Sequence, residues 1–252
     1  MRELRWGSSW GPVSQRLGFA SVDTLPRPDE SWQNGAMDMD DHESTEQTPD
    51  EVFITAVLFE CGLAVLALFL GWVIGPSARQ LIPELGLEQW WPIAKGILLG
   101  LAAALPILLF IELIRRIPWG PIQELEDLAN DGMIKALLQL RPSELIVVSL
   151  CAGVGEELLF RGWLMYWIAD WAEALIPALP FYWVMGFALA LSSLVFGVFH
   201  PVTKLYICLA TLMGLYFGAL VVYTENLLIP IVAHGAYDAA QLISTAREER
   251  KK

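Results

Sequence analysis

The amino-acid sequence predicts an all-α protein, a polytopic bundle of about six transmembrane helices plus one amphipathic interfacial helix. Hydrophobic residues make up 55% of the 252 residues and charged residues only 17%, with a mean hydropathy of +0.49. Soluble domains carry about 25% charged residues. The apolar runs are too long and too uniform for the alternating strands of a membrane barrel, so each spanning segment is expected to be a helix. The same composition argues against a water-soluble globule, a nucleic-acid binder and a disulfide-stapled secreted domain.

The first segment, residues 1–50, is polar, contains Pro26, Pro28 and Pro49, and holds much of the acidity behind the net charge of −12. It has too little apolar surface to offset the entropy of ordering, so we predict a disordered acidic cytoplasmic tail. It lacks the continuous apolar stretch of a typical secretory signal peptide.

From residue 51 the composition becomes apolar, and we predict a membrane-embedded bundle over 51–246 followed by a basic cytoplasmic C-terminus over 247–252. About 20 apolar residues are needed to cross the hydrocarbon core. The segments that meet or approach this length are 52–74, 93–114, 145–168, 181–200, 205–223 and 227–243. The last is short and carries polar residues. Between the second and third spans, residues 121–141 mix leucines with acidic residues, which is typical of an amphipathic helix at the interface. A regulatory or substrate-docking role and a plain connection are both open for this helix.

Basic residues predict the orientation, because cytoplasmic loops are enriched in Lys and Arg. Placing both termini in the cytoplasm leaves only Arg79 and Lys95 on the outer side. The cytoplasmic side then receives Arg2, Arg5, Arg16, Arg27, Arg115, Arg116, Lys135, Arg141, Lys204, Arg247, Arg250, Lys251 and Lys252. Aromatic side chains fall at the expected span ends, at Trp90, Trp91, Trp119, Trp167, Trp171, Tyr182 and Trp183.

Ionisable residues within the predicted spans are costly and therefore mark a functional site or a structural pair. Glu157 and Arg161 are four residues apart on one helix face, where a bidentate pair would neutralise both charges. Glu156 points about 100° away from Glu157 and has no local partner. An unpaired buried carboxyl group suits a general base.

Two of the three histidines also lie in predicted spans. Phe196 and His200 share a face at the end of span four, and His234 and Asp238 share a face in span six. A helix bundle could bring these side chains to one polar pocket with Glu156. Two histidines with carboxylates can hold a divalent ion such as Zn²⁺ or activate a water directly, which indicates hydrolysis. The simpler alternative for each pair is inter-helix hydrogen bonding.

Together these motifs resemble the signature of the CPBP intramembrane proteases, a family that includes CAAX prenyl proteases and bacteriocin-processing and immunity-type membrane proteins. The resemblance covers about residues 145–240. It rests on Glu156-Glu157-x-x-x-Arg161, Phe196-x-x-x-His200 and His234-x-x-x-Asp238, in that order.

The resemblance implies that Glu156 and His200 activate water and that His234 and Asp238 stabilise the oxyanion. Glu157, Arg161 and Phe196 would support them. It also implies a membrane-bound or hydrophobic peptide substrate, with metal-dependent and glutamate-type mechanisms both open. The family commonly has Asn or Asp where Asp238 stands, and an acidic group there suits metal binding or orientation of His234.

One geometric difficulty and two alternative functions stay open. His200 ends its predicted span, which offsets it by about 10–15 Å from mid-bilayer unless the span is tilted or short, or unless the pocket lies in the cytoplasmic half. The alternatives to a protease are a non-catalytic membrane scaffold or immunity factor, and an ion-coupled transporter that uses the buried charges as a relay.

Overall fold

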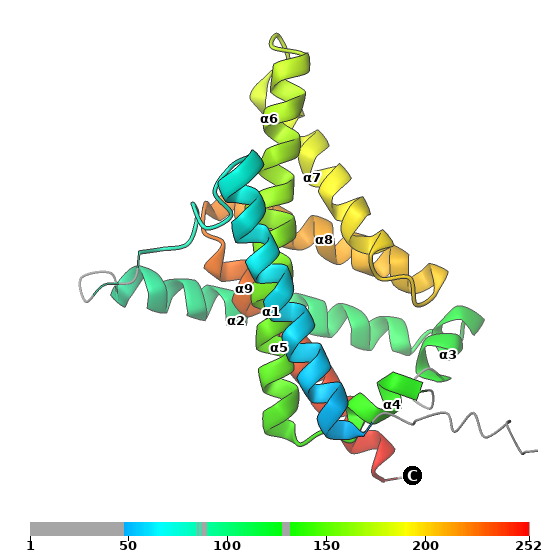
Figure 1. Ribbon diagram of the computed structural model, residues 1–252. Helices are drawn as coiled ribbons and strands as arrows, with labels where there is room; N and C mark the ends of the chain where they lie inside the picture. The colour runs from blue at the N-terminus through cyan, green and yellow to red at the C-terminus, as the bar shows by residue number, and fades with distance from the viewer. Residues whose placement is uncertain (1–47, 85, 87–89, 128–131, 252) are drawn as a thin grey trace, which may run out of the picture. The chain divides into compact units, whose positions relative to one another are not determined.

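The computed structural model describes residues 48–84, 86, 90–127 and 132–251, and every regular element within these ranges is a helix (Figure 1). The predicted all-α class is therefore confirmed. The predicted tail up to residue 47 lies outside the described residues. The elements are α1 (Pro49–Ile74), α2 (Trp90–Arg115), α3 (Gly120–Asp127), α4 (Gly132–Leu138), α5 (Pro142–Glu157), the π-helix η5 (Leu158–Leu164), α6 (Met165–Leu175), α7 (Phe181–Val198), α8 (Lys204–Thr224) and α9 (Leu228–Glu249).

The first helix begins earlier than the sequence predicts, within the last residues of the predicted tail. The Thr48 hydroxyl accepts a hydrogen bond from the Glu51 amide, and the Glu51 carboxylate accepts one from the Thr48 amide. This reciprocal capping box satisfies two amides that the helix itself leaves without acceptors. Pro49 occupies the first helical turn, where its missing N–H costs nothing.

Four helices, α1, α2, α7 and α8, are long and apolar enough to cross a membrane. Large apolar side chains on them face outward, including Leu58, Phe69, Leu105 and Leu194. The buried polar side chains, in contrast, lie inside, on α5, η5, α7 and α9. Because soluble proteins rarely expose large contiguous apolar patches, this distribution indicates an integral membrane protein.

The other two predicted spans differ from uniform apolar helices. Residues 145–168 fall in an uninterrupted helical segment from Pro142 to Leu175, in which the π-helix η5 separates α5 from α6. Residues 227–243 fall in α9, which carries polar side chains along its length. Neither meets the length and composition that the other four meet, so the count of about six spans stays a prediction.

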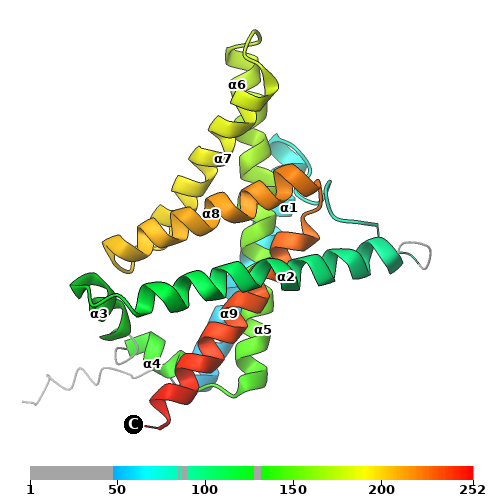
Figure 2. The ribbon, with the colours of Figure 1, turned by 180° about the vertical axis from the view of Figure 1, so that it is seen from behind.

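The segment from α5 through α6 is the axis around which the other helices are arranged (Figures 1 and 2). Helices α1 and α9 both pack along α5, α7 packs against α6, and α8 lies beside α7. Helix α2 crosses α9 on the face away from α5, as the reverse view shows (Figure 2). The bundle thus brings α1, α5, α7 and α9 around the junction of α5 and η5.

The predicted interfacial helix over 121–141 corresponds to two short helices, α3 and α4, with residues 128–131 between them outside the described residues. The chain that follows α4 packs against the end of α9, where Leu140, Leu145 and Ala246 share an apolar cluster. The Arg250 guanidinium donates to the Leu140 carbonyl at 2.7 Å. The basic C-terminus is therefore helical as far as Glu249 and docked on the bundle.

Close approach of backbones in this bundle depends on small residues. A Cβ atom added at Gly153 of α5 would lie 2.6 Å from the Ile231 carbonyl oxygen and 2.9 Å from the Gly235 amide nitrogen, both of α9. Small residues let membrane helices approach at backbone distance. The α5–α9 contact that carries most of the polar residues is therefore set by glycine.

We expect Gly153→Val to force α5 and α9 apart. Overpacking of this kind costs about 1–3 kcal/mol, which lowers Tm by roughly 2–12 °C for a chain of this size. Gly62→Val in α1 is the matched control, because nothing lies within 4 Å of a Cβ at Gly62. Thermal unfolding of the purified protein in detergent measures the difference. Equal destabilisation by the two substitutions would contradict the packing argument.

Candidate active site

The structure brings the residues predicted from the three motifs to one place at the α5–η5 junction. Glu156 and Glu157 end α5, Arg161 lies one turn on in η5, and His234 reaches them from α9; all four are at least 92% buried. The remaining predicted residues are Phe196 of α7, His200 just beyond it, and Asp238 of α9. The cluster is polar inside a bundle whose outside is apolar.

One carboxylate oxygen, Glu157 Oε1, connects two helices of this cluster. It lies 2.8 Å from Arg161 Nη1 and 3.0 Å from His234 Nδ1. The predicted Glu157–Arg161 pairing is present, but the predicted bidentate geometry is wrong, because Glu157 Oε2 and Arg161 Nη2 have no hydrogen-bond partner among the residues that the structure describes. The guanidinium instead lies over the Phe196 ring, with its central carbon 4.1 Å from the ring centroid. Cation–π contact of this kind partly compensates a desolvated cation.

Glu156 points into the space between the two histidines. Its Oε1 lies 3.6 Å from His200 Nε2, and its Oε2 lies 3.7 Å from His234 Nε2. Both separations exceed hydrogen-bond length. Glu156 Oε2 is buried without a hydrogen-bond partner among the described groups. The carboxylate is thus held close to two imidazoles without being bonded to either.

His200 is oriented by its own backbone. Its Nδ1 lies 2.7 Å from the Phe196 carbonyl oxygen, and because a carbonyl oxygen only accepts, Nδ1 must donate. Nε2 then faces Glu156. Helix α7 ends at Val198, so His200 lies just beyond the helix rather than at its end as predicted, yet its side chain turns back into the cluster. The offset expected from the sequence does not separate His200 from Glu156.

His234 is fixed from both faces and both nitrogens. Its ring stacks on Phe217 of α8 with centroids 4.9 Å apart, and Phe196 meets it edge-on at 6.2 Å. Nδ1 donates to the Glu157 carboxylate, which leaves Nε2 between Glu156 and Asp238. Asp238 Oδ2 is 3.3 Å from Nε2. The ring can therefore move little, and Nε2 is the ring nitrogen that faces Glu156 and Asp238.

The donor set has the chemistry of a divalent-metal site. Zinc ligands lie about 2.0–2.2 Å from the ion, so two ligands of one tetrahedral ion are about 3.4 Å apart. The His234–Asp238 separation of 3.3 Å and the Glu156–His200 separation of 3.6 Å are close to that value. Within the described ranges, however, no group of three or more His, Cys, Asp or Glu side chains is arranged to hold a metal ion. The donors fit by type, and separations of 3.3–3.7 Å link Glu156 to both histidines and His234 to Asp238.

A carboxylate that the motifs do not include, Glu60 of α1, also reaches this cluster. It interacts electrostatically with Glu156, His234, Asp238 and His200. The signal that could have found it is simple: Glu60 is the only charged residue between Val52 and Ile74. An ionisable residue inside a membrane span is a functional candidate by default.

An aromatic residue, Tyr206 of α8, was also missed. Its ring lies 6.0 Å from the His200 ring, and it interacts electrostatically with Asp238 and Glu156. Its position near the start of an apolar span gives no sign of such a role in the sequence.

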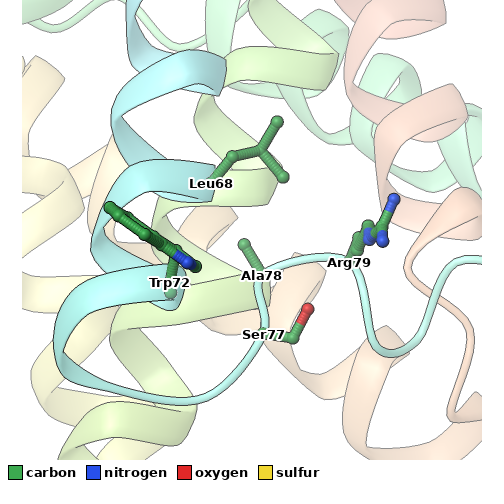
Figure 3. Close-up of a pocket in the computed structure, with 6 residues that line it drawn as sticks. Leu68, Trp72, Ser77, Ala78 and Arg79 are labelled. Atoms are coloured by element: carbon green, nitrogen blue, oxygen red, sulfur yellow. The ribbon is translucent and has the colours of Figure 1, made fainter.

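A pocket elsewhere in the bundle lies at the end of α1 and the following turn (Figure 3). It is lined by Leu68, Gly71, Trp72, Ser77, Ala78 and Arg79. It contains no carboxylate or imidazole that could move a proton. We therefore assign the candidate chemistry to the charged cluster.

The chain also matches one protein-family model. Residues 139–240 match the family model described as type II CAAX prenyl endopeptidase Rce1-like. This confirms the resemblance inferred from the motifs, over nearly the same residues. No curated protein and no solved structure matches the chain. The matched segment contains each of the three motifs, whereas Glu60 lies outside it.

The buried ion pair between Glu157 and Arg161 leads to a prediction about the stability of the protein. Arg161→Met should lower the free energy of unfolding by about 3–5 kcal/mol, because it leaves Glu157 as a buried, less compensated charge. The double variant Glu157→Gln/Arg161→Met should lose less than the single variant. Arg116→Met is the control, since its pair with Glu112 has the same spacing but is exposed and worth about 0–1 kcal/mol. Equal losses for Arg161→Met and Arg116→Met, by thermal unfolding, would contradict this account.

Proposed function

We propose that this protein is an intramembrane endopeptidase that hydrolyses a peptide bond of a membrane-associated protein or peptide, using water activated by Glu156 and His200. The observation that carries the proposal is the buried Glu156 carboxylate with two imidazole Nε2 atoms within 3.7 Å. The match of residues 139–240 to an endopeptidase family supports the same reaction class.

The gap between Glu156 and His200 suits a water molecule. A carboxylate oxygen and an unprotonated Nε2 are both acceptors, so a water that donates to both would bridge them. Such a water is held for attack while Glu156 takes one of its protons, which is general-base catalysis. The proton then passes to the nitrogen of the scissile bond as the carbon–nitrogen bond breaks.

His234 faces the other end of the reacting group. When Nε2 carries a proton, it can donate to the oxygen of the tetrahedral intermediate, and preorganised donors of this kind contribute strongly to acyl-transfer rates. Asp238 would orient that proton from one turn along α9. Glu157 holds Nδ1, and Arg161 holds Glu157, so these two act as the support of the donor.

The proposed function also implies a class of substrate and a membrane topology. The family description names CAAX prenyl endopeptidases, so a lipidated peptide in the bilayer is the natural substrate class to test. We propose six spans in total, with the α5–α6 segment and α9 completing the four apolar helices. Both termini would then be cytoplasmic, and the site would open toward the cytoplasm.

Replacing Glu156 is the direct test of this function. We expect Glu156→Gln to reduce cleavage by about 10²–10⁴-fold, because the amide does not accept the proton of water, while the protein still accumulates. The measurement is cleavage of a fluorescent peptide that ends in farnesylated Cys-Val-Ile-Met, together with terminal-peptide profiling of host membranes. Glu173→Gln, an exposed carboxylate of α6, is the control. Full activity in Glu156→Gln would refute the assignment.

The alternatives make different predictions. A scaffold or immunity factor would keep its phenotype in the double variant Glu156→Gln/His234→Ala. A transporter would move ions or solutes into proteoliposomes and lose that movement in the same variant. The family match and the proximity of Glu156 to two histidines favour the protease.

Metal dependence is a separate question with its own test. Glu156, His200, His234 and Asp238 would hold a divalent ion such as Zn²⁺, and a bound ion supplies a polarised water. Because Glu156 and His200 can hold and deprotonate a water without an ion, we expect cleavage to survive dialysis against a chelator. Metal content is measured on the same sample. Loss of cleavage that Zn²⁺ restores would instead identify these residues as ligands.

A further inference from the structure

Glu60 lies beside the site on α1, a helix that carries none of the three motifs. It comes from α1, which crosses α5 at backbone distance: a Cβ at Gly155 would collide with the Glu60 carbonyl oxygen and would lie 3.4 Å from Glu60 Oε2. Gly155 directly precedes Glu156. The Glu60 carboxylate therefore lies at the crossing of α1 and α5, one residue along α5 from the proposed general base, whereas His234 comes from α9.

One oxygen of the partly buried Glu60 carboxylate lacks the donor that a buried oxygen needs. Its Oε2 is buried, and no described group donates a hydrogen bond to it. Leaving a buried charged acceptor without a donor is costly. The neighbours in electrostatic contact with it include two further carboxylates, Glu156 and Asp238. The arrangement is one that a donor or a positive charge from a bound molecule would stabilise.

A peptide undergoing hydrolysis supplies such a group at a defined point. As water adds to the carbonyl carbon, the scissile nitrogen becomes basic, receives the proton from Glu156, and leaves as an amine with N–H donors and growing positive charge. The carbonyl oxygen of the same peptide bond becomes negative and would be stabilised beside His234. The nitrogen would be stabilised on the side lined by carboxylates.

We propose that Glu60 is a further catalytic residue, whose carboxylate accepts a hydrogen bond from the N–H of the leaving amine. This inference rests on the proposed endopeptidase function. Glu60 takes no proton in the step: the proton moves from water to Glu156 and then to the nitrogen, while the carbon–nitrogen bond breaks. The role of Glu60 is to stabilise the charge that develops on that nitrogen.

The test compares an amide with an ester in the same farnesylated Cys-Val-Ile-Met peptide. In the ester an oxygen replaces the scissile N–H, so Glu60 loses its partner while water still attacks the same carbonyl carbon, and each variant is compared with the unmodified protein on the same peptide. A hydrogen bond to a charged acceptor predicts that Glu60→Leu lowers kcat on the amide by about 10–100-fold, with KM changed less than about threefold. Glu60→Gln should fall between, since its amide oxygen still accepts without charge. On the ester, both variants should match the unmodified protein.

Controls separate this inference from the function on which it rests. Glu156→Gln should abolish hydrolysis of both peptides, and Glu173→Gln should affect neither. Thermal unfolding verifies that the Glu60 variants are folded. Equal losses on amide and ester, or no loss on either, would overturn the role of Glu60 and leave the protease intact. If the unmodified protein hydrolyses neither peptide, the proposed function fails for this substrate class and the role of Glu60 fails with it.

Discussion

The buried carboxylate of Glu157 is the interaction on which the arrangement of this site depends. A charge inside a membrane protein is tolerated only when partners replace its hydration. Here Oε1 accepts from both Arg161 in η5 and His234 in α9. These two hydrogen bonds therefore connect the central helical segment to α9 and fix the orientation of the His234 ring. Loss of either donor would disturb the packing and the chemistry together.

Such short links form only because the helix backbones lie very close. Gly153 and Gly235 face each other across the α5–α9 contact, and Gly155 faces the backbone of α1. In lipid the driving force for helix association is packing rather than exclusion of water, so small residues at crossings bring more atoms into contact. The same closeness allows side chains as short as Asp238 to take part. Packing and polar chemistry are therefore specified by the same residues.

The sequence predicts this site to the extent that its geometry is local. The pairs Glu157–Arg161 and His234–Asp238 follow from helical spacing, and the structure has both within 3.3 Å. The placement of His200 depends on where α7 ends and how its side chain turns back, which is a tertiary property. The π-helix also has no clear local signal, because α and π turns differ by only one residue in their hydrogen bonding.

Glu60 illustrates a different limit. Its position in the middle of an apolar span marks it as exceptional, but its partners are 96 to 178 residues away in sequence, and only the packing of the helices reveals them. The spans α1 and α2, in contrast, could be predicted from the sequence, because bilayer thickness and hydropathy constrain each span independently of its neighbours. Local patterns thus predict which segments enter the membrane, whereas the crossings decide which charges meet.

The distribution of charge in the cluster affects how the site would stabilise the oxygen and the nitrogen of a peptide bond during hydrolysis. Four carboxylates, Glu60, Glu156, Glu157 and Asp238, interact with His234 or with each other, and Arg161 directly pairs with only one of them. An oxyanion placed among them would be disfavoured unless a proton on His234 Nε2 faced it. A developing ammonium would be favoured without such a donor. Three of the four carboxylates come from α1 and α5, whereas Asp238 shares α9 with His234, and this asymmetry would select the direction in which a peptide bond lies across the site.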